Sequence, residues 1–218
     1  MSIAPQADSH DTTETNPPPR SRRGDWTWEM VRMFPQQGYW TEESYLAREF
    51  EGLVEYSDGV LEFLPMPTWL HQLLVDYLHS HLKQFVQTRS LGLTAFAPLR
   101  VRVGLRQYRE PDILFVTPSR FRGDDRPAEG ADLVMEVVSD AQEDRERDLV
   151  EKRKDYAAAG IPEYWIVDPK SETITVLVLE NSGYRVHGDF ETGSIASSVL
   201  LPGFEIDVDE CFRSGRVQ

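Results

Sequence analysis

The sequence predicts a domain of the α/β (α+β) class. Two apolar runs, residues 112–116 and 132–138, are rich in Val, Ile, Leu and Phe, as buried strands are. Between residues 70 and 85, Leu, Tyr and Phe recur at helical spacing and form one apolar stripe. A charged segment at 143–159 ends at a glycine and a proline, which is typical of a helix followed by another strand.

Composition indicates one substantial folded domain. The 218 residues are 40% hydrophobic, enough to build a core. We predict a disordered tail at 1–24, a helical arm at 25–52 and the main domain at 53–218. No run approaches the ~18 apolar residues of a membrane helix, and the N-terminal stretch has no apolar signal segment. We therefore expect a cytoplasmic protein that does not associate with membranes.

The net charge of −14 argues against casual binding to polyanions, because nucleic-acid affinity comes largely from Lys and Arg contacts with phosphates. A net charge can hide a local basic patch. The densest basic stretch of the main domain holds Arg100, Arg102, Arg106 and Arg109, in and after a predicted half-buried strand. We predict that these arginines contact phosphates, and the alternative is an ordinary solvated face.

Two elements are predicted before the apolar stripe. Thr41 precedes Glu42 as a helix cap, and we expect a helix over Glu42–Glu51. Asp58-Gly59 predicts a tight hairpin in which Glu55 faces Glu62. Directly opposed like charges destabilise a strand pair, so this register requires a cation or basic side chain nearby, unless both glutamates point into water.

Three histidines lie on the helix predicted after Thr68. His81 falls within the apolar stripe and is expected to be buried, whereas His79 is expected on the polar face. His71 lies at the edge of the stripe, from which a side chain can reach a site. His71 is therefore the candidate functional histidine.

The two apolar strands carry the chemistry, since each contains one carboxylate, Asp112 or Glu136. A charged carboxylate in an apolar strand pays a large desolvation cost, and it persists only with a proton, a basic partner or a metal. Both faces of the strand around Glu136 are otherwise apolar, which predicts a central strand. Oxygen ligands suit Mg²⁺ or Mn²⁺, and the lone Cys211 excludes a Cys-based zinc site.

Beyond the charged helix, short strands are predicted at 164–167, 173–180 and 184–187. The C-terminal stretch LPGFEIDVDECF is expected to pack back onto the domain.

Several ordered blocks of the chain resemble a known family. They are EYSDGVLEFLPMPTWLHQ, REPDILFV, DLVMEVVS, DLVEKRKDYAAAGIPEYWIVDP and LLPGFEID, within Tyr39–Phe212. The order resembles the PD-(D/E)XK nuclease superfamily and, more narrowly, its Uma-type family of restriction-endonuclease-like proteins. The resemblance implies a restriction-endonuclease-like core, a mixed β-sheet flanked by helices.

The resemblance also implies roles for individual residues. Asp112 and Glu136, with the backbone carbonyl of Val137, would hold the metal. The superfamily lysine two residues after the acidic residue is replaced here by Val138, and the Uma-type pattern has a lysine in the following helix that matches Lys152. Glu55, Glu62 and His71 also match that pattern, and we predict Glu62 and His71 as catalytic together with Asp112, Glu136 and Lys152.

Helical geometry favours the same lysine. On a helical wheel Lys152 lies on the side of Tyr156, which packs on the sheet, whereas Lys154 points away. The alternative is a lysine that lays its stem over the apolar face and keeps its ammonium group in water.

The function predicted from these observations is a metal-dependent endonuclease that hydrolyses DNA phosphodiester bonds with Mg²⁺ or Mn²⁺. The alternative is a catalytically silent nuclease-fold module that serves protein binding or assembly, which the charge of −14 favours. DNA is the predicted partner, and a homodimer is left open.

Overall fold

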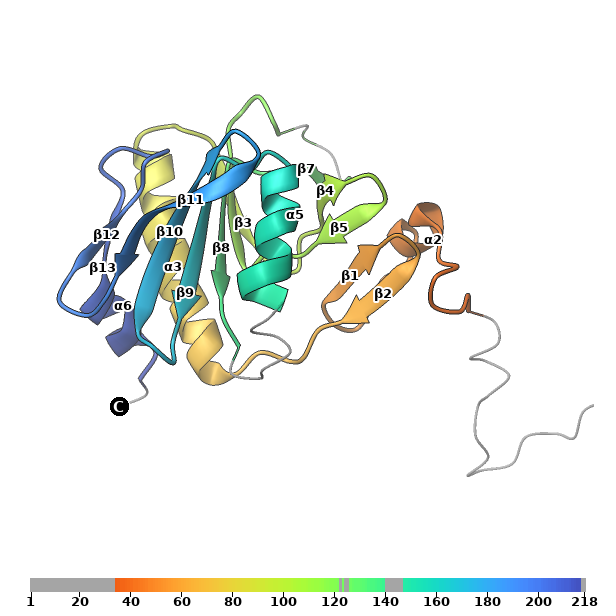
Figure 1. Cartoon of the computed structure of the whole chain (residues 1–218), viewed down its shortest axis with the longest axis horizontal. Helices are drawn as coiled ribbons and strands as arrows, with labels where there is room; N and C mark the ends of the chain where they lie inside the picture. The colour runs from red at the N-terminus through yellow and green to blue at the C-terminus, as the bar shows by residue number, and fades with distance from the viewer. Residues whose placement is uncertain (1–33, 122, 124–125, 140–146, 217–218) are drawn as a thin grey trace, which may run out of the picture. The chain divides into compact units, whose positions relative to one another are not determined.

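The computed structural model describes residues 34–121, 123, 126–139 and 147–216, which include most of one compact unit, Gln36–Gln218 (Figure 1). The tail predicted at 1–24 lies outside the described residues. So do residues 140–146, which include the first turn of the helix predicted at 143–159.

A six-stranded mixed sheet forms the centre of this unit. Its order is β11-β10-β9-β8-β6-β3, with β8 and β9 parallel and the other neighbours antiparallel. The strands are β3 (Leu93–Phe96), β6 (Ile113–Val116), β8 (Leu133–Val137), β9 (Glu163–Asp168), β10 (Thr173–Glu180) and β11 (Gly183–Phe190). All five residues of β8 are buried, which confirms the predicted central strand.

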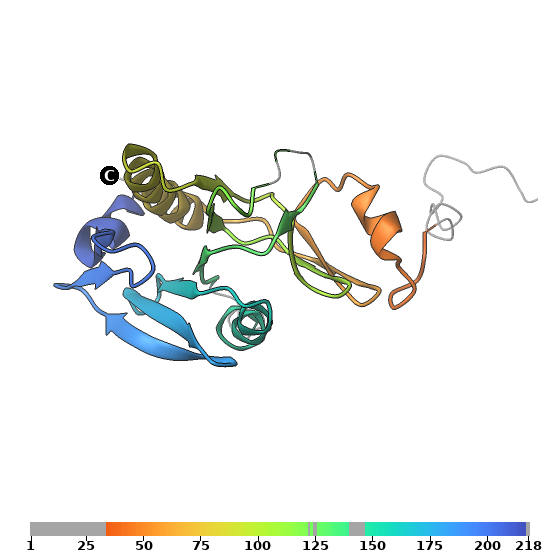
Figure 2. The same cartoon turned by 90° about the horizontal axis from the view of Figure 1, so that it is seen from above.

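Helices cover both faces of this sheet (Figures 1 and 2). On one face, α3 (Trp69–Thr88) packs with the C-terminal strands β12 (Ile195–Ser197) and β13 (Glu205–Asp207) and with α6 (Val208–Ser214). On the other face, a π-helical turn at Arg147–Glu151 leads into α5 (Lys152–Ala158). The predicted mixed sheet flanked by helices and the predicted docking of the C-terminal stretch are thus confirmed.

The two faces of β8 follow the predicted alternation. Leu133, Met135 and Val137 belong to the core beneath α3, whereas Val134 and Val138 belong to the core beneath α5. Glu136 shares the second face, because side chains alternate along a strand. This alternation directs the carboxylate of Glu136 toward α5.

A second sheet, of order β2-β1-β5-β4-β7, adjoins the first through the chain that enters β6. Its strands are β1 (Val54–Ser57), β2 (Val60–Phe63), β4 (Val101–Gly104), β5 (Gln107–Arg109) and β7 (Ala128–Glu129). The β1–β2 pairing sets Glu55 opposite Glu62, as predicted. Positive φ angles at Asp58 and Gly59, 42° and 92°, are those of the tight turn that this dipeptide favours.

One helix is shorter than predicted. Thr41 caps α2, but α2 spans only Glu42–Leu46 rather than Glu42–Glu51. The ring of Phe50 stacks on Tyr45, with centroids 5.9 Å apart. Residues five apart do not share a helix face, so the chain must leave the helix for Phe50 to join this aromatic cluster.

The burial of two histidines of α3 is the reverse of what the sequence predicted. His81 is exposed and its Nδ1 lies 2.7 Å from the carbonyl of Tyr77, whereas His79 is half-buried against β3, with Nε2 3.2 Å from the hydroxyl of Thr94. Val75 and Val86 are part of the buried stripe and shift its centre toward His79. Among the described residues, none of the helices is long and apolar enough to cross a membrane.

Candidate active site

The two carboxylates of the apolar strands meet at one end of the large sheet. The β6–β8 ladder pairs Ile113 with Met135, so its continuation by one residue sets Asp112 opposite Glu136. The amide of Val137 donates to Asp112 Oδ2 at 2.8 Å, which fixes this junction. Asp112 and Glu136 line a cavity of about 110 Å³ together with His71, Glu110 and Lys152.

Asp112 is held by His71 from the first turn of α3. His71 Nε2 lies 3.2 Å from Asp112 Oδ2, and the Thr68 hydroxyl that caps α3 accepts from the amide of His71. Burial alone would raise the pKa of Asp112, but His71 and Lys152 outweigh it and hold this pKa below its usual value. Asp112 is therefore a carboxylate at neutral pH, and the side chain of His71 reaches it from the edge of the apolar stripe.

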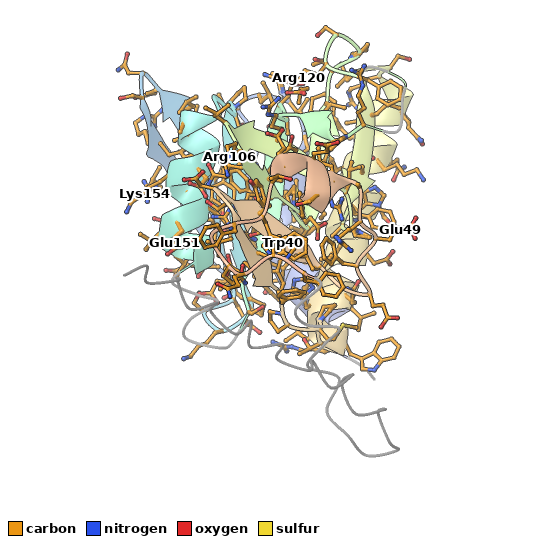
Figure 3. The ribbon with its side chains drawn as sticks, turned by 90° about the vertical axis from the view of Figure 1, so that its right-hand side faces the viewer. Trp40, Glu49, Arg106, Arg120, Glu151 and Lys154 are labelled. Carbon is orange, nitrogen blue, oxygen red and sulfur yellow. The ribbon has the colours of Figure 1, made fainter. Side chains whose placement is uncertain are left out.

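Lys152 contacts Glu136 from the opposite side of the cavity. Its Nζ lies 2.9 Å from Glu136 Oε2 and 3.9 Å from Glu55 Oε1, and the residue is only 3% exposed. One helical turn later, the Tyr156 hydroxyl donates to Glu136 Oε1 at 2.5 Å. Lys154 is exposed on α5 (Figure 3). The predicted helix phase is confirmed, and the alternative of a solvated ammonium group at Lys152 is wrong.

A basic side chain stands beside the opposed glutamates, as their register requires. Arg109 Nη1 lies 2.5 Å from Glu55 Oε2 and 3.4 Å from Glu62 Oε2, while its Nη2 lies 2.6 Å from Asp155 Oδ2. Burial would raise the pKa of Glu55, but Lys152 and Arg109 outweigh it and lower that pKa. Glu55 is fully buried, which excludes the alternative in which both glutamates point into water. Only the side chain of Glu62 is partly exposed to solvent.

Glu55, rather than Glu62, is the glutamate of this pair that reaches the candidate site. Glu55 Oε1 lies 3.9 Å from Lys152 Nζ, whereas Glu62 contacts Arg109, which in turn contacts Glu55. Neither glutamate lines the cavity itself, but the side chain of Glu62 is 42% exposed, whereas that of Glu55 is 1% exposed. The structure thus brings Asp112, Glu136, Lys152 and His71 together and leaves Glu62 one ion pair further out.

The four arginines predicted to contact phosphates do not form one exposed surface. Arg109 is 5% exposed and belongs to the interior network described above. Arg100 Nε lies 3.6 Å from Glu110 Oε1, Arg102 Nη2 lies 3.4 Å from Glu42 Oε1, and Arg106 Nη1 lies 3.3 Å from Asp58 Oδ1. Each guanidinium group therefore already faces a carboxylate of this chain.

Sequence reasoning missed two residues of the site, Glu110 and Tyr156. Glu110 lines the cavity, and its Oε2 accepts from the amide of Val54 at 3.0 Å. Burial raises the pKa of Glu110 to about 6 despite the opposing effects of that amide and of Arg100. The signal for Tyr156 was its position four residues after Lys152, which places both on one helix face.

The donor set suits a hard divalent cation. The hydrogen bonds of the Asp112 carboxylate to His71 and to the amide of Val137 both use Oδ2, so Oδ1 has no partner among the described residues. Mg²⁺ is commonly bound by one or two carboxylates, with waters and substrate phosphates completing its octahedron. No three His, Cys, Asp or Glu side chains gather as a metal site in the described part of the chain, so a complete protein cage is not what these residues offer.

Comparisons with known proteins agree with this architecture. Residues 42–209 match the sequence model of the Uma2 family, which is described as "Putative restriction endonuclease". No curated protein matches the chain. Among solved structures, the fold is similar to the crystal structure of a putative nuclease belonging to DUF820 from Anabaena variabilis ATCC 29413, with a TM-score of 0.66 and 18% identity. The match covers 80% of this chain and 98% of that one.

Proposed function

This chain belongs to the Uma2 family of putative restriction endonucleases, and on that basis we propose that it is a nuclease whose active site is the cavity between Asp112, Glu136 and Lys152. The proposed reaction is metal-dependent hydrolysis of a DNA phosphodiester bond, in which water adds at phosphorus and one P–O ester bond breaks. The cofactor proposed is Mg²⁺, or Mn²⁺ in its place.

One observation carries this proposal: the opposed positions of Asp112 and Glu136 in one buried cavity, with Lys152 Nζ 2.9 Å from Glu136. Two carboxylates and an ammonium group at one sheet end are groups that metal-dependent phosphodiester hydrolysis can use. The carboxylates supply oxygen ligands, and the ammonium group supplies a compact positive charge beside them.

Each residue has a distinct task in the proposed mechanism. Asp112 Oδ1 and Glu136, with the carbonyl of Val137, would hold the cation. That cation would lower the pKa of a bound water and neutralise charge that develops on the phosphate. Lys152 donates toward the same space and orients the attacking water, while His71 and the amide of Val137 fix the carboxylate plane of Asp112. Glu55 and Tyr156 position Lys152 and Glu136.

A nicking assay on supercoiled plasmid DNA tests this proposal. We expect the wild-type protein to nick DNA with Mn²⁺ or Mg²⁺ and to be inactive in EDTA. Asp112→Asn and Glu136→Gln should each lower the rate by at least about a hundredfold, since each removes a charged ligand. Asp132→Asn is the matched control, because it changes a buried carboxylate immediately before β8, the strand of Glu136, but outside the cavity. Wild-type rates in Asp112→Asn would refute the assignment.

A catalytically silent module is the rival, and one observation favours it. Asp112 and Glu136 each already have a basic partner, His71 and Lys152, so the network is partly neutralised without a metal. Calorimetry with Mn²⁺ separates the two readings. Saturable binding that is lost in Asp112→Asn supports the nuclease, whereas no binding by the wild-type protein supports the silent module.

A further inference from the structure

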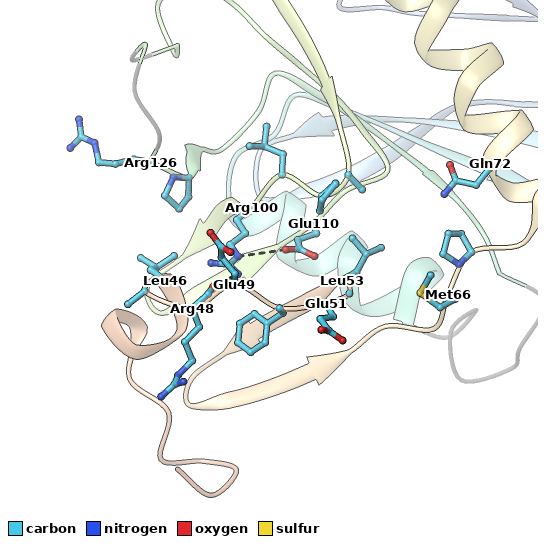
Figure 4. Close-up of a pocket in the computed structure, with 18 residues that line it drawn as sticks. Leu46, Arg48, Glu49, Glu51, Leu53, Met66, Gln72, Arg100, Glu110 and Arg126 are labelled. Atoms are coloured by element: carbon cyan, nitrogen blue, oxygen red, sulfur yellow. Dashed lines mark hydrogen bonds and ion pairs between the residues drawn. The ribbon is translucent and has the colours of Figure 1, made fainter. Parts of the chain in front are cut away.

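A larger groove joins the cavity of the candidate active site. Its volume is about 790 Å³, and it shares lining residues with the cavity (Figure 4). The shared residues are Leu53, Pro67, Gln72, Ala97 and Glu110. A ligand that extends beyond the carboxylates would therefore pass into this groove.

The groove does not present the charge pattern of a phosphate-binding surface. Three arginines line it, but so do three glutamates, and Arg100 lies 3.6 Å from one of them, Glu110. The lining arginines are Arg48, Arg100 and Arg126, and the glutamates are Glu49, Glu51 and Glu110. Duplex DNA is bound mainly through uncompensated Lys and Arg at its phosphates, and neither this groove nor a chain of net charge −14 offers many.

Large apolar side chains are exposed around the same opening. Phe96, 54% exposed, lines the cavity, and Met66, 80% exposed, lines the groove. Trp69, 81% exposed, precedes the shared lining residue Gln72 by three positions in α3 and so lies on the same helix face. Apolar groups with such high exposure, gathered beside a cavity, mark a surface that contacts a ligand.

Phe63 of β2 is a further exposed aromatic residue near the groove. It is 66% exposed, and its ring lies edge-on to that of Phe50, a groove-lining residue, with centroids 6.3 Å apart. The apolar residues thus come from β2, the segment that follows it, α3 and β3. Phe96 lines the cavity and Met66 lines the groove, while Phe63 contacts the groove-lining Phe50.

From these observations we propose that the substrate of the site is an unpaired nucleic-acid strand, whose bases stack on Trp69 and Phe96 while its backbone enters the carboxylate cavity. Bases in a duplex are stacked on one another and hide their faces, whereas unpaired bases offer them to aromatic side chains. Removing one such aromatic side chain typically weakens the binding of an unpaired strand by about fivefold or more. This proposal rests on the proposed nuclease function and names the substrate class of the same site.

Binding in EDTA tests the substrate class without cleavage. Fluorescence anisotropy would compare a labelled unpaired DNA oligonucleotide with the duplex of the same sequence. We expect the unpaired strand to bind at least tenfold more tightly. We also expect a shallow salt dependence, because as many glutamates as arginines line the groove and each phosphate contact to a single strand adds only about −0.7 to the slope.

Single substitutions then test the stacking residues. Trp69→Ala and Phe96→Ala should each weaken binding of the unpaired strand by about fivefold or more, because each removes one stacking side chain. Phe121→Ala is the matched control, since Phe121 is 55% exposed, close to the 54% of Phe96, but lines a different cavity. The control should change affinity by less than twofold. All three side chains are largely exposed, and thermal unfolding of each variant checks that its fold is kept.

The outcomes separate this proposal from the proposed function. Equal or tighter duplex binding, or unchanged affinity in both Trp69→Ala and Phe96→Ala, would overturn the unpaired-strand proposal even where plasmid nicking succeeds. Conversely, stacking-dependent binding of the unpaired strand without any metal-dependent cleavage would overturn only the nuclease activity.

Discussion

Lys152 lies between two carboxylates in the interior, 2.9 Å from Glu136 and 3.9 Å from Glu55. We expect Lys152→Ala to lower the nicking rate by about a hundredfold or more with little change in Mn²⁺ affinity. The reason is that a group acting mainly in the transition state affects the rate more than the binding of the ground state. Nicking rates and calorimetric titration of Mn²⁺ measure the two effects separately.

Lys154→Ala is the control for this substitution, because Lys154 belongs to the same helix but is exposed. It should nick DNA at the wild-type rate. A strong loss in Lys154→Ala with none in Lys152→Ala would reverse the assignment. Removing Lys152 also takes a buried cation away from Glu136 and Glu55, so rates must be compared at a temperature at which urea titration finds the variant folded.

Arg109 connects three elements that are distant in the sequence: the β1–β2 hairpin, β5 and α5. Its guanidinium group contacts Glu55, Glu62 and Asp155 while only 5% exposed. We expect Arg109→Ala to lower the free energy of unfolding by about 3–5 kcal/mol, because it leaves the fully buried Glu55 without its closest cation. Equilibrium unfolding in urea gives this quantity.

Arg106→Ala provides the comparison. Arg106 lies in the turn that precedes β5, and it pairs with the exposed Asp58 of the β1–β2 turn. An exposed ion pair contributes little to stability, so this variant should unfold close to the wild-type protein. Similar losses in both variants would mean that Arg109 does not hold the hairpin to α5 as the contacts indicate.

Elements defined by local pattern could be predicted from the sequence. The Asp58-Gly59 turn determined the register of β1 and β2, and alternation determined the two faces of β8. The end of α2 and the burial of His79 could not be predicted in this way. Both depend on tertiary contacts, the stacking of Phe50 on Tyr45 and the packing of α3 against β3, which a local pattern does not contain.

The same distinction holds for the candidate site. Asp112 and Glu136 could be identified because a carboxylate in an apolar strand is costly, and Lys152 because helical phase is local. The network around Arg109 was missed because its partners Glu55 and Asp155 lie 54 and 46 residues away in the sequence. An alternating strand pattern indicates that an arginine side chain points away from the apolar face, but it does not indicate which carboxylates the guanidinium group contacts.

For the whole molecule, buried carboxylates with opposite pKa shifts govern the dependence of stability on pH. The pKa values of Glu55 and Asp112 are lowered by their basic neighbours, so the stability that they contribute is present at neutral pH. That stability is lost as the pH falls through their lowered values, below the usual 4.5 and 3.8. Glu110 acts in the other direction, because burial raises its pKa to about 6.

A raised carboxyl pKa means that the folded protein binds the Glu110 proton more tightly than the unfolded chain does. Lowering the pH from 7 to 5 should therefore stabilise the wild-type protein through Glu110, before the loss of the Glu55 and Asp112 contributions below about pH 4.5. Urea midpoints of the wild-type protein and of Glu110→Gln, measured between pH 4 and 8, test this directly. As the pH falls from 7 to 5, the urea midpoint of the wild-type protein should rise relative to that of Glu110→Gln. The histidines and the remaining carboxylates titrate in both proteins, so their effects cancel in this comparison. A difference that is independent of pH in this interval would mean that Glu110 titrates at its ordinary value and that its carboxylate is solvated in the groove beside Arg100.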